Sequence, residues 1–522
     1  MKTRSQVAMK PTAPVAGNGR VGKKTGGYDK KNAGTQAIPS KSRSTHTKRK
    51  RDETESDGDD TGAKAKRSKS SSAPVKKSGA KKSTILAKTL PQPTTTIIEA
   101  PTTPLEVFVF GEGSGGELGL GSEAIIGQTV DVTRPRLNPH LSAEDVGVVQ
   151  VSCGGLHGIA LTKDNKVLTW GVNDHGALGR DTNVQQGDDD DMNPAESIPR
   201  PVDMSTLDPN IEWAQVVGSD NASFALTKDG RVYGWGTFRN SNGIMGFRGI
   251  KDIQKTPCLI PELKSIVQLA AGNNHVLAID NKGQIYAWGC AEQYQIGRAV
   301  RTRHLELGLR PECIGRQPMR AADAKAVKIA CGSYHSFALD QEGRVFAWGL
   351  NNFGQLGFSD RAGENDACQI RPRLVESLLD YKIVDIVGGE HHSLAATADG
   401  KLLVWGRCDG FRVGLQSEAF TPDNSIFDES GRPRILTQPT VVQGLPPVAS
   451  VAAGTDHSFA LTVDGKAYSW GFSSGGRTGL NTEDDIEVPT LLNSKSVRDK
   501  KLTFADAGGP FSVLASVIRP TA

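Results

Sequence analysis

Most of the chain repeats one alternation of hydrophobic and polar positions. Residues 223–227 (SFALT) and 231–236 (RVYGWG) alternate in this way, and residues 228–230 (KDG) between them contain a turn-forming glycine. Alternating runs joined by such a turn predict a β-hairpin. A short apolar run lies upstream in a unit, as at 267–270, and another run follows a proline, as after Pro257. The pattern predicts four strands in each unit.

Two short motifs mark the units and give their period. Trp-Gly recurs at spacings of 53 to 65 residues, and Phe110-Gly111 is a degenerate first copy. The tryptophans are Trp170, Trp235, Trp288, Trp348, Trp405 and Trp470. Thirteen residues before them lies a Gly-x-x-His turn with His157, His275, His335, His392 or His457, and Ala222 stands at the matching place in the remaining unit. A self-similar unit at near-constant spacing is typical of a repeat fold.

The two ends of the repeat region are incomplete in complementary ways. The first unit has residues 107–111 (VFVFG) without the half before it, and the last has residues 508–511 (GGPF) without a following Trp-Gly. Joining these halves completes one unit and leaves no open strand edge in the ring. We therefore predict an all-β, seven-bladed β-propeller over residues 101–522, closed by N- and C-terminal segments that share one blade.

Charge divides the chain into a basic tail and an acidic body. Of its 62 basic and 58 acidic residues, 23 and 7 lie in residues 1–90, so that segment bears a net charge of +16 and the remainder bears −12. Residues 1–100 have few aromatic or branched apolar side chains, which predicts disorder. Two basic clusters predict nuclear import and DNA binding; they contain Lys48, Arg49, Lys50, Arg51, Lys64, Lys66 and Arg67. The alternative is a tail that only solubilises the protein.

Several chemistries lack the residues that they need. The seven cysteines form no Cys-x-x-Cys pair and no zinc-type spacing, so we expect a reduced intracellular compartment and no metal. The sequence has no apolar run of about 18 residues and no secretory signal. It also has no P-loop, no His-Glu-x-x-His motif and no Ser/His/Asp set, so we expect no covalent catalysis and no cofactor.

The repeated tryptophans and histidines are interpreted as scaffold. A catalytic site needs a few unlike groups that converge, whereas these residues recur at equivalent positions around a ring. We expect each Trp to fill the space between blades and each His to hydrogen-bond backbone at its turn. Function is then expected where a unit departs from the repeat.

One departure is an insertion in the second unit. A glycine normally follows the motif aromatic by nine residues, but Gly246 follows Trp235 by eleven. The two extra residues predict a protruding hairpin with Ile244 and Met245 near its tip, available for a contact. The alternative is that both side chains pack back onto a neighbouring blade. The candidate contact residues of this hairpin are Arg239, Asn240, Asn242, Gly243, Ile244, Met245 and Gly246.

Other departures concern charge. The residues just before the repeat histidine include Asp220, Glu390 and Asp456, which predict an acidic face that suits a basic partner, or else a merely solvated rim. The insertion at residues 298–316 carries Arg301 and Arg303, candidates for a contact with nucleic acid or an acidic protein surface. Residues 188–191 (DDDD) predict a mobile acidic loop.

The motif G-x-x-H-S-x-A-L-x-x-D-G-x-V-x-x-W-G-x-x-x-x-G-x-L-G resembles the repeat of the regulator of chromosome condensation family over about residues 105–518. The insertion at 239–246 (RNSNGIMG) resembles the β-wedge of the family's guanine-nucleotide exchange factors for the small GTPase Ran. The resemblance implies exchange without bond breaking, by stabilising nucleotide-free Ran on chromatin in the nucleus. Because the propeller hosts many functions, a non-catalytic chromatin or ubiquitin-ligase adaptor is the alternative.

The same resemblance implies roles for single residues and partners. Asp220 matches an aspartate that faces Ran, and His391 or His392 matches a functionally important histidine. Asn274 stands where the family often has Asp. If the position contributes by charge, a neighbour such as Asp220 or Asp456 must compensate, and if it contributes by hydrogen bonding, Asn suffices. The implied partners are Ran, DNA and histones of the nucleosome, and a nuclear-import receptor that binds the tail.

Overall fold

The computed structural model describes residues 98–121, 131–183, 192–249, 252–314 and 325–518. Lys88–Ala522 form one compact unit. The basic clusters of the tail and the acidic run 188–191 lie outside the described residues, so the conclusions drawn on them stay predictions. In the described part of the chain, no helix is long and apolar enough to cross a membrane.

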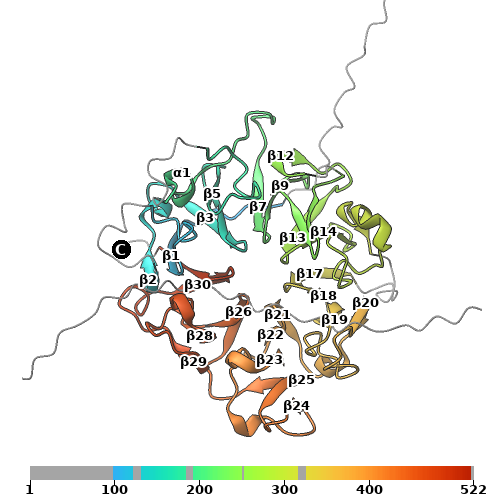
Figure 1. Ribbon diagram of the computed structural model, residues 1–522. Coiled ribbons are helices and arrows are strands. Elements are labelled where there is room, and N and C mark those ends of the chain that lie inside the picture. The colour runs from blue at the N-terminus through green and yellow to red at the C-terminus, as the bar shows by residue number, and fades with distance from the viewer. Residues whose placement is uncertain (1–97, 122–130, 184–191, 250–251, 315–324, 519–522) are drawn as a thin grey trace, which may run out of the picture. The chain divides into compact units, whose positions relative to one another are not determined.

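Seven antiparallel sheets, called blades 1 to 7 here, form a closed ring (Figure 1). Blade 1 consists of β3 (Val148–Cys153), β4 (His157–Thr162), β5 (Val167–Gly171) and β6 (Arg200–Pro201). Blade 2 consists of β7 (Trp213–Gly218), β8 (Ala222–Thr227), β9 (Val232–Gly236) and β12 (Gln254–Leu259). Blade 3 consists of β13 (Ile266–Ala271), β14 (His275–Asp280), β15 (Ile285–Gly289) and β16 (Glu312–Cys313). Blade 4 consists of β17 (Ala326–Cys331), β18 (His335–Asp340), β19 (Val345–Leu350) and β20 (Cys368–Leu374). Blade 5 has five strands, which are β21 (Ile383–Gly388), β22 (His392–Thr397), β23 (Leu402–Arg407), β25 (Pro433–Val442) and β24 (Ser425–Phe427). Blade 6 consists of β26 (Val448–Ala453), β27 (His457–Thr462), β28 (Ala467–Gly471) and β29 (Ile486–Leu491). Blade 7 consists of β30 (Leu502–Ala507), β31 (Phe511–Val517), β1 (Leu105–Gly111) and β2 (Val132–Leu137).

Short elements connect these strands. A separate two-stranded sheet follows β9 and consists of β10 (Phe238–Asn240) and β11 (Gly243–Gly246). The helical segments are α1 (Pro194–Ser197), η2 (Pro139–Leu141), η3 (Thr302–Leu309), η4 (Glu376–Leu378), η5 (Asp409–Phe411), η6 (Ser417–Ala419) and η7 (Ser474–Gly476). The predicted seven-bladed propeller is confirmed.

The ring closes through blade 7, as predicted. The N-terminal strand β1 pairs antiparallel with the C-terminal strand β31 from Leu105↔Val517 to Gly111↔Phe511. Because the two ends of the body hold one sheet together, the chain itself fastens the ring, and the first strands of blades 7 and 1 lie side by side.

The motif tryptophans are fully buried and bind the preceding blade. Five of the six donate their indole N–H to the carbonyl that lies seven residues after the preceding motif aromatic, at 2.8 to 2.9 Å. The pairs are Trp170 to Glu117, Trp235 to Ala177, Trp348 to Gln295, Trp405 to Gln355 and Trp470 to Arg412. The tryptophan is thus both a packing element and a hydrogen-bond donor between blades.

Each repeat histidine also bonds to the next blade. Its Nε2 lies 2.8 to 2.9 Å from a serine Oγ there, in the pairs His157–Ser223, His275–Ser336, His335–Ser393, His392–Ser458 and His457–Ser512. Each serine hydroxyl donates to a backbone carbonyl, so the histidine must donate to the serine and carries its proton on Nε2. The expectation that the histidine bonds backbone at its own turn is wrong. We call this arrangement the His–Ser relay.

Strand direction places the connections of each blade on two opposite faces. The turns between first and second strands share one face with the loops between third and fourth strands, and this face carries β10–β11, so we call it the hairpin face. The turns between second and third strands lie on the opposite face. There the backbone N–H of Ile98 donates to the carbonyl of Lys228 at 3.0 Å. The chain therefore joins the ring on the face opposite the inserted hairpin.

Candidate functional site

The predicted insertion folds as a hairpin that stands on the interface between blades 2 and 3. Arg239 pairs with Ile244 and Asn240 with Gly243, and residues 241–242 form the tip. Gly243 adopts a φ of +107°, which disfavours any residue with a side chain. The side chain of Ile244 is 48% exposed, whereas Met245 is half-buried and packs against the hydrophobic cluster between the two blades. One of the two apolar side chains is therefore free for a contact, and the other packs back.

Two side chains of blade 3 hold the hairpin. Asn274 Oδ1 accepts a hydrogen bond from the backbone N–H of Arg239 at 2.7 Å. The Glu292 carboxylate accepts from the backbone N–H of Ser241 at 3.0 Å and from its hydroxyl at 2.6 Å. Because the acceptor is an oxygen that Asn and Asp share, Asn274 keeps the hydrogen bond without the charge. The sequence analysis did not single out Glu292 because it stands at a variable position of the repeat motif.

Asp220 lies at the base of the hairpin. Its carboxylate accepts from Asn221 Nδ2 at 2.7 Å, and its backbone N–H donates to the Asn273 carbonyl at 3.0 Å. Burial raises the pKa of Asp220, and the hydrogen bond from Asn221 and the charge of Arg239 oppose that rise. Asp220 makes no ion pair among the described residues, so its charge is available to a basic partner.

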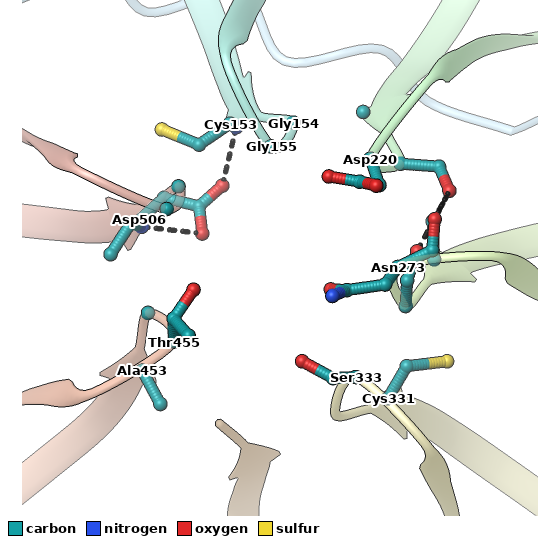
Figure 2. Close-up of a pocket in the computed structure, with 18 of the residues that line it drawn as sticks. Cys153, Gly154, Gly155, Asp220, Asn273, Cys331, Ser333, Ala453, Thr455 and Asp506 are labelled. Carbon is teal, nitrogen blue, oxygen red and sulfur yellow. Dashed lines mark hydrogen bonds between the residues drawn. The ribbon is translucent and has the colours of Figure 1, made fainter. Parts of the chain in front are cut away.

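The turns before the histidines surround one central opening. Figure 2 shows Asp220, Asn273, Ser333 and Thr455, from four blades, around a cavity of about 240 Å³. Asp506 lines the same cavity and accepts from the Cys153 backbone N–H at 2.8 Å, and burial raises its pKa to about 6. Among the described residues no group of three His, Cys, Asp or Glu side chains could hold a metal ion. The opening presents polar turns, as a docking surface does.

The two candidate histidines have different environments. His392 is fully buried in its His–Ser relay, so a docked protein cannot touch it and we drop it as a contact residue. His391 keeps 14% of its side chain exposed and packs between Tyr334, which stacks on it at 5.7 Å between ring centroids, and Phe353, which is tilted at 4.9 Å. Burial, with the charges of nearby arginines, lowers the pKa of His391 to about 4, so its imidazole is neutral at pH 7.

The predicted acidic face is partly neutralised within the protein. Arg412 Nη2 lies 2.6 Å from Asp456 Oδ1, and its Nε donates to the same oxygen at 2.7 Å. Burial and the charge of Asp456 raise the pKa of Glu390. Asp220, rather than Asp456, is therefore the carboxylate that is available to form an ion pair with a basic partner.

The arginine-rich insertion divides into a structural part and an exposed part. Arg298 Nε lies 3.4 Å from a Glu312 carboxylate oxygen, and its Nη2 donates to the Arg310 carbonyl at 2.9 Å, so it holds the loop together. Arg301 and Arg303 are exposed at the start of η3, which lies against β11. They stand on the hairpin face and make no ion pair with the described residues, so they can meet an acidic surface.

The chain is similar to known proteins along most of its length. Residues 106–514 match the family described as RCC1-like domain. Protein pim1 of Schizosaccharomyces pombe is 41% identical over 426 residues, which cover 81% of this chain and 76% of that protein. Guanine nucleotide exchange factor SRM1 of Saccharomyces cerevisiae is 38% identical, over 79% of this chain and 88% of that protein.

A solved structure supports the same similarity. The crystal structure of Prp20p from Saccharomyces cerevisiae, described with its binding properties to Gsp1p and histones, matches with a TM-score of 0.73 and 37% sequence identity. The match covers 82% of this chain and 97% of that one. The fold and the sequence therefore point to the same family.

Proposed function

We propose that this chain, which belongs to the RCC1-like domain family, is a guanine-nucleotide exchange factor for the small GTPase Ran. The observation that carries the proposal is the inserted hairpin, which replaces the regular loop of blade 2 and is held by Asn274 and Glu292 with Ile244 exposed. The relative SRM1 is named a guanine nucleotide exchange factor, which agrees with this function.

The proposed mechanism is displacement. The hairpin β10–β11 presses against the phosphate-binding region of Ran with Ile244, while Asn240 and Asn242 offer polar groups at its tip. An exchange factor that binds nucleotide-free Ran more tightly than loaded Ran lowers the barrier to nucleotide release. The reaction forms and breaks no covalent bond, so the abundant nucleotide decides which product accumulates.

The neighbouring turns supply the rest of the Ran contact. Asp220 meets a basic surface of Ran, and Asn274 positions the hairpin through Arg239. His391 contributes a neutral imidazole beside Phe353, and Asp456 acts with Arg412 as a paired group. These roles place the whole interface on the hairpin face.

We further propose that the protein acts on chromatin in the nucleus. The basic clusters of residues 48–51 and 64–67 would bind DNA and a nuclear-import receptor, with an affinity for DNA that falls steeply as salt rises. The chain joins the ring at Ile98, on the face opposite the hairpin. Arg301 and Arg303 would add a contact to an acidic histone surface. The relative Prp20p is described with binding to histones, which supports this partner.

Release of a fluorescent GDP analogue from Ran tests the proposal. Catalytic amounts of the full chain should accelerate release, and Ile244→Ser should lose at least tenfold in rate because it removes the exposed apolar contact. Val463→Ser is the matched control, since Val463 is 63% exposed on the opposite face. No acceleration by the folded, unaltered chain would reject the exchange function and favour a non-catalytic adaptor.

A further inference from the structure

One backbone position recurs in the loop after the motif aromatic, and two blades fill it unusually. The sixth residue after the aromatic has a positive φ, between +55° and +82°. It is Gly116 in blade 7, Gly176 in blade 1, Gly354 in blade 4 and Gly476 in blade 6. In blade 3 the residue is Tyr294 with φ of 58°, and in blade 5 it is Phe411 with φ of 55°.

Hydrogen bonds show that these positions are equivalent. In each turn the carbonyl of this residue accepts from the backbone N–H of a glycine three residues later, at 2.9 to 3.2 Å. The pairs are Gly116 with Gly119, Gly176 with Gly179, Tyr294 with Gly297, Gly354 with Gly357, Phe411 with Gly414 and Gly476 with Gly479. The aromatic residues therefore occupy a turn that the rest of the ring builds with glycine.

The surroundings of the position differ from blade to blade. A Cβ on Gly116, Gly176 or Gly476 would come within 2.6 to 2.8 Å of a neighbouring atom, whereas a Cβ on Gly354 would meet its nearest neighbour at 3.4 Å. In blades 3 and 5 the neighbours leave room for a whole aromatic ring. A bulky residue in the left-handed region is a strained outlier, and such strain concentrates where a side chain is needed for function.

The two rings pack only in part inside the protein. In the described part of the chain, Tyr294 and Phe411 belong to no hydrophobic core cluster and make no aromatic or cation–π contact, and the Tyr294 hydroxyl makes no hydrogen bond. Tyr294 is partly buried, and Phe411 is 39% exposed. Packing within the ring therefore accounts for only part of each side chain.

Both residues lie on the hairpin face, on either side of the candidate site. Tyr294 follows Glu292, which holds the hairpin tip through Ser241. Phe411 lies in the loop of blade 5, the blade that carries His391, and lines a groove of about 1120 Å³ together with Leu415, Phe420 and Arg434. An aromatic anchor is thus present in each of two blades that flank the central opening.

We infer that Tyr294 and Phe411 are docking anchors for the GTPase that the hairpin acts on, an inference that rests on the proposed function. They extend the contact from blade 2 across blades 3 and 5. Aromatic side chains dominate the energetics of many protein interfaces because they bury a large area with little loss of conformational freedom. Since both anchors lie outside the hairpin, they bind loaded and nucleotide-free GTPase alike and raise affinity rather than the rate of release.

This assignment predicts a separation of kinetic parameters. With Ran as the substrate, Tyr294→Gly/Phe411→Gly should raise KM at least tenfold and leave kcat within about twofold, because uniform binding is removed. Ile244→Ser should instead lower kcat. The glycine variant restores the residue that the other blades use, so its melting temperature should not fall by more than a few degrees.

Three variants of the full chain serve as controls. Ser265→Gly relieves a positive φ of 54° on the opposite face, where Gly147 is the counterpart in blade 1, and should leave KM unchanged. Tyr294→Asn/Phe411→Asn keeps a residue that tolerates the left-handed region and should match the glycine variant, which separates loss of the ring from loop flexibility. Tyr294→Phe/Phe411→Tyr should keep KM near that of the unaltered chain.

The outcomes separate the two proposals. An unaltered chain that exchanges nucleotide while the glycine variant keeps its KM overturns the anchors and leaves the exchange function standing. An equal fall in kcat and kcat/KM in the glycine variant also overturns them, because the rings would then act on nucleotide release. A folded, unaltered chain that neither binds Ran nor exchanges its nucleotide overturns the exchange function and the anchors together.

Discussion

Five interfaces of the ring carry the His–Ser relay, and the interface beneath the inserted hairpin does not. Between blades 2 and 3, Ala222 stands in place of the histidine and Val276 in place of the serine. Phe224, Phe238 and Phe247 fill the space instead, with Phe238 and Phe247 stacked at 5.9 Å between centroids. At five interfaces the His–Ser relay joins the blades, whereas under the hairpin aromatic packing takes the place of the relay.

The insertion explains the difference. A motif tryptophan donates to a carbonyl seven residues after the previous motif aromatic, but after Trp235 that stretch of chain is lifted into β10–β11. Trp288 Nε1 is therefore buried with no hydrogen-bond partner. An unpaired buried N–H costs about 1–3 kcal/mol, and the stacked phenylalanines offset that loss. The repeat is thus broken where the hairpin stands.

The ring-closing interface sharpens the comparison. There Phe511 and Gly158 also replace the histidine and serine, yet Trp170 keeps its hydrogen bond to Glu117. Loss of the His–Ser relay alone therefore does not deprive the tryptophan indole N–H of its hydrogen-bond acceptor. The unpaired indole N–H of Trp288 therefore results from the inserted hairpin.

Acid should break the relay interfaces with the largest effect. Burial lowers the pKa of His157 to about 4 and those of His275, His335 and His457 to about 3, from 6.5 in the unfolded chain. The unfolded state binds the protons first, so the stabilisation is fully present above pH 6.5 and is lost as pH falls toward 3 to 4. Each relay histidine lowers the free energy of unfolding by up to about 1.4 kcal/mol per pH unit in this window.

Urea unfolding at pH 7.5 and pH 5 measures this dependence. Because the pKa of Asp506 is raised in the folded protein, its protonation stabilises the fold as pH falls, which offsets part of the stability lost through one histidine. His157→Gln should flatten the pH dependence because it removes one titrating group. An unfolding free energy that stays constant over this range would contradict neutral buried histidines.

Phe247→Ala should break the hairpin interface. The side chain is fully buried between Phe224 and Phe238, so its removal should lower the free energy of unfolding by about 3–5 kcal/mol. Ser393→Ala, which removes one relay hydroxyl, should cost about 1–3 kcal/mol. Urea titrations of the two variants compare the interfaces directly, and a smaller loss for Phe247→Ala would mean that the aromatic packing is not the main support there.

Glu292→Gln should have the smallest effect on stability. It weakens the hydrogen bonds to Ser241 at the exposed hairpin tip, so the free energy of unfolding should change by less than about 1 kcal/mol. Hydrogen exchange in the hairpin peptide should speed up, and kcat for nucleotide release should fall several-fold. Glu262→Gln, which loses an exposed ion pair with Arg248, is the control. Unchanged exchange in the hairpin would show that Glu292 does not restrain it.

Part of the site was accessible from the sequence. The spacing of Gly246 after Trp235 located the hairpin, because a repeat exposes any change in its length. Asp220 was accessible as a residue of equivalent turns, and Asn274 and His391 were accessible through the resemblance to the family. Glu292 was not singled out, because only the structure shows which loop touches the hairpin. Tyr294 and Phe411 stand where the motif has glycine, but only the structure shows that the turn keeps its positive φ at these residues.

The sequence by itself determined the seven-bladed ring, its closure and the place of the insertion, because strand alternation and repeat spacing are local properties of the chain. Only the tertiary structure decided which of Ile244 and Met245 is free, that His392 is a relay residue, and that Asp456 is paired with Arg412. Those outcomes depend on side chains from blades that are far apart in sequence. Burial and pairing are properties of what surrounds a residue, and in a propeller the neighbouring blade supplies most of it.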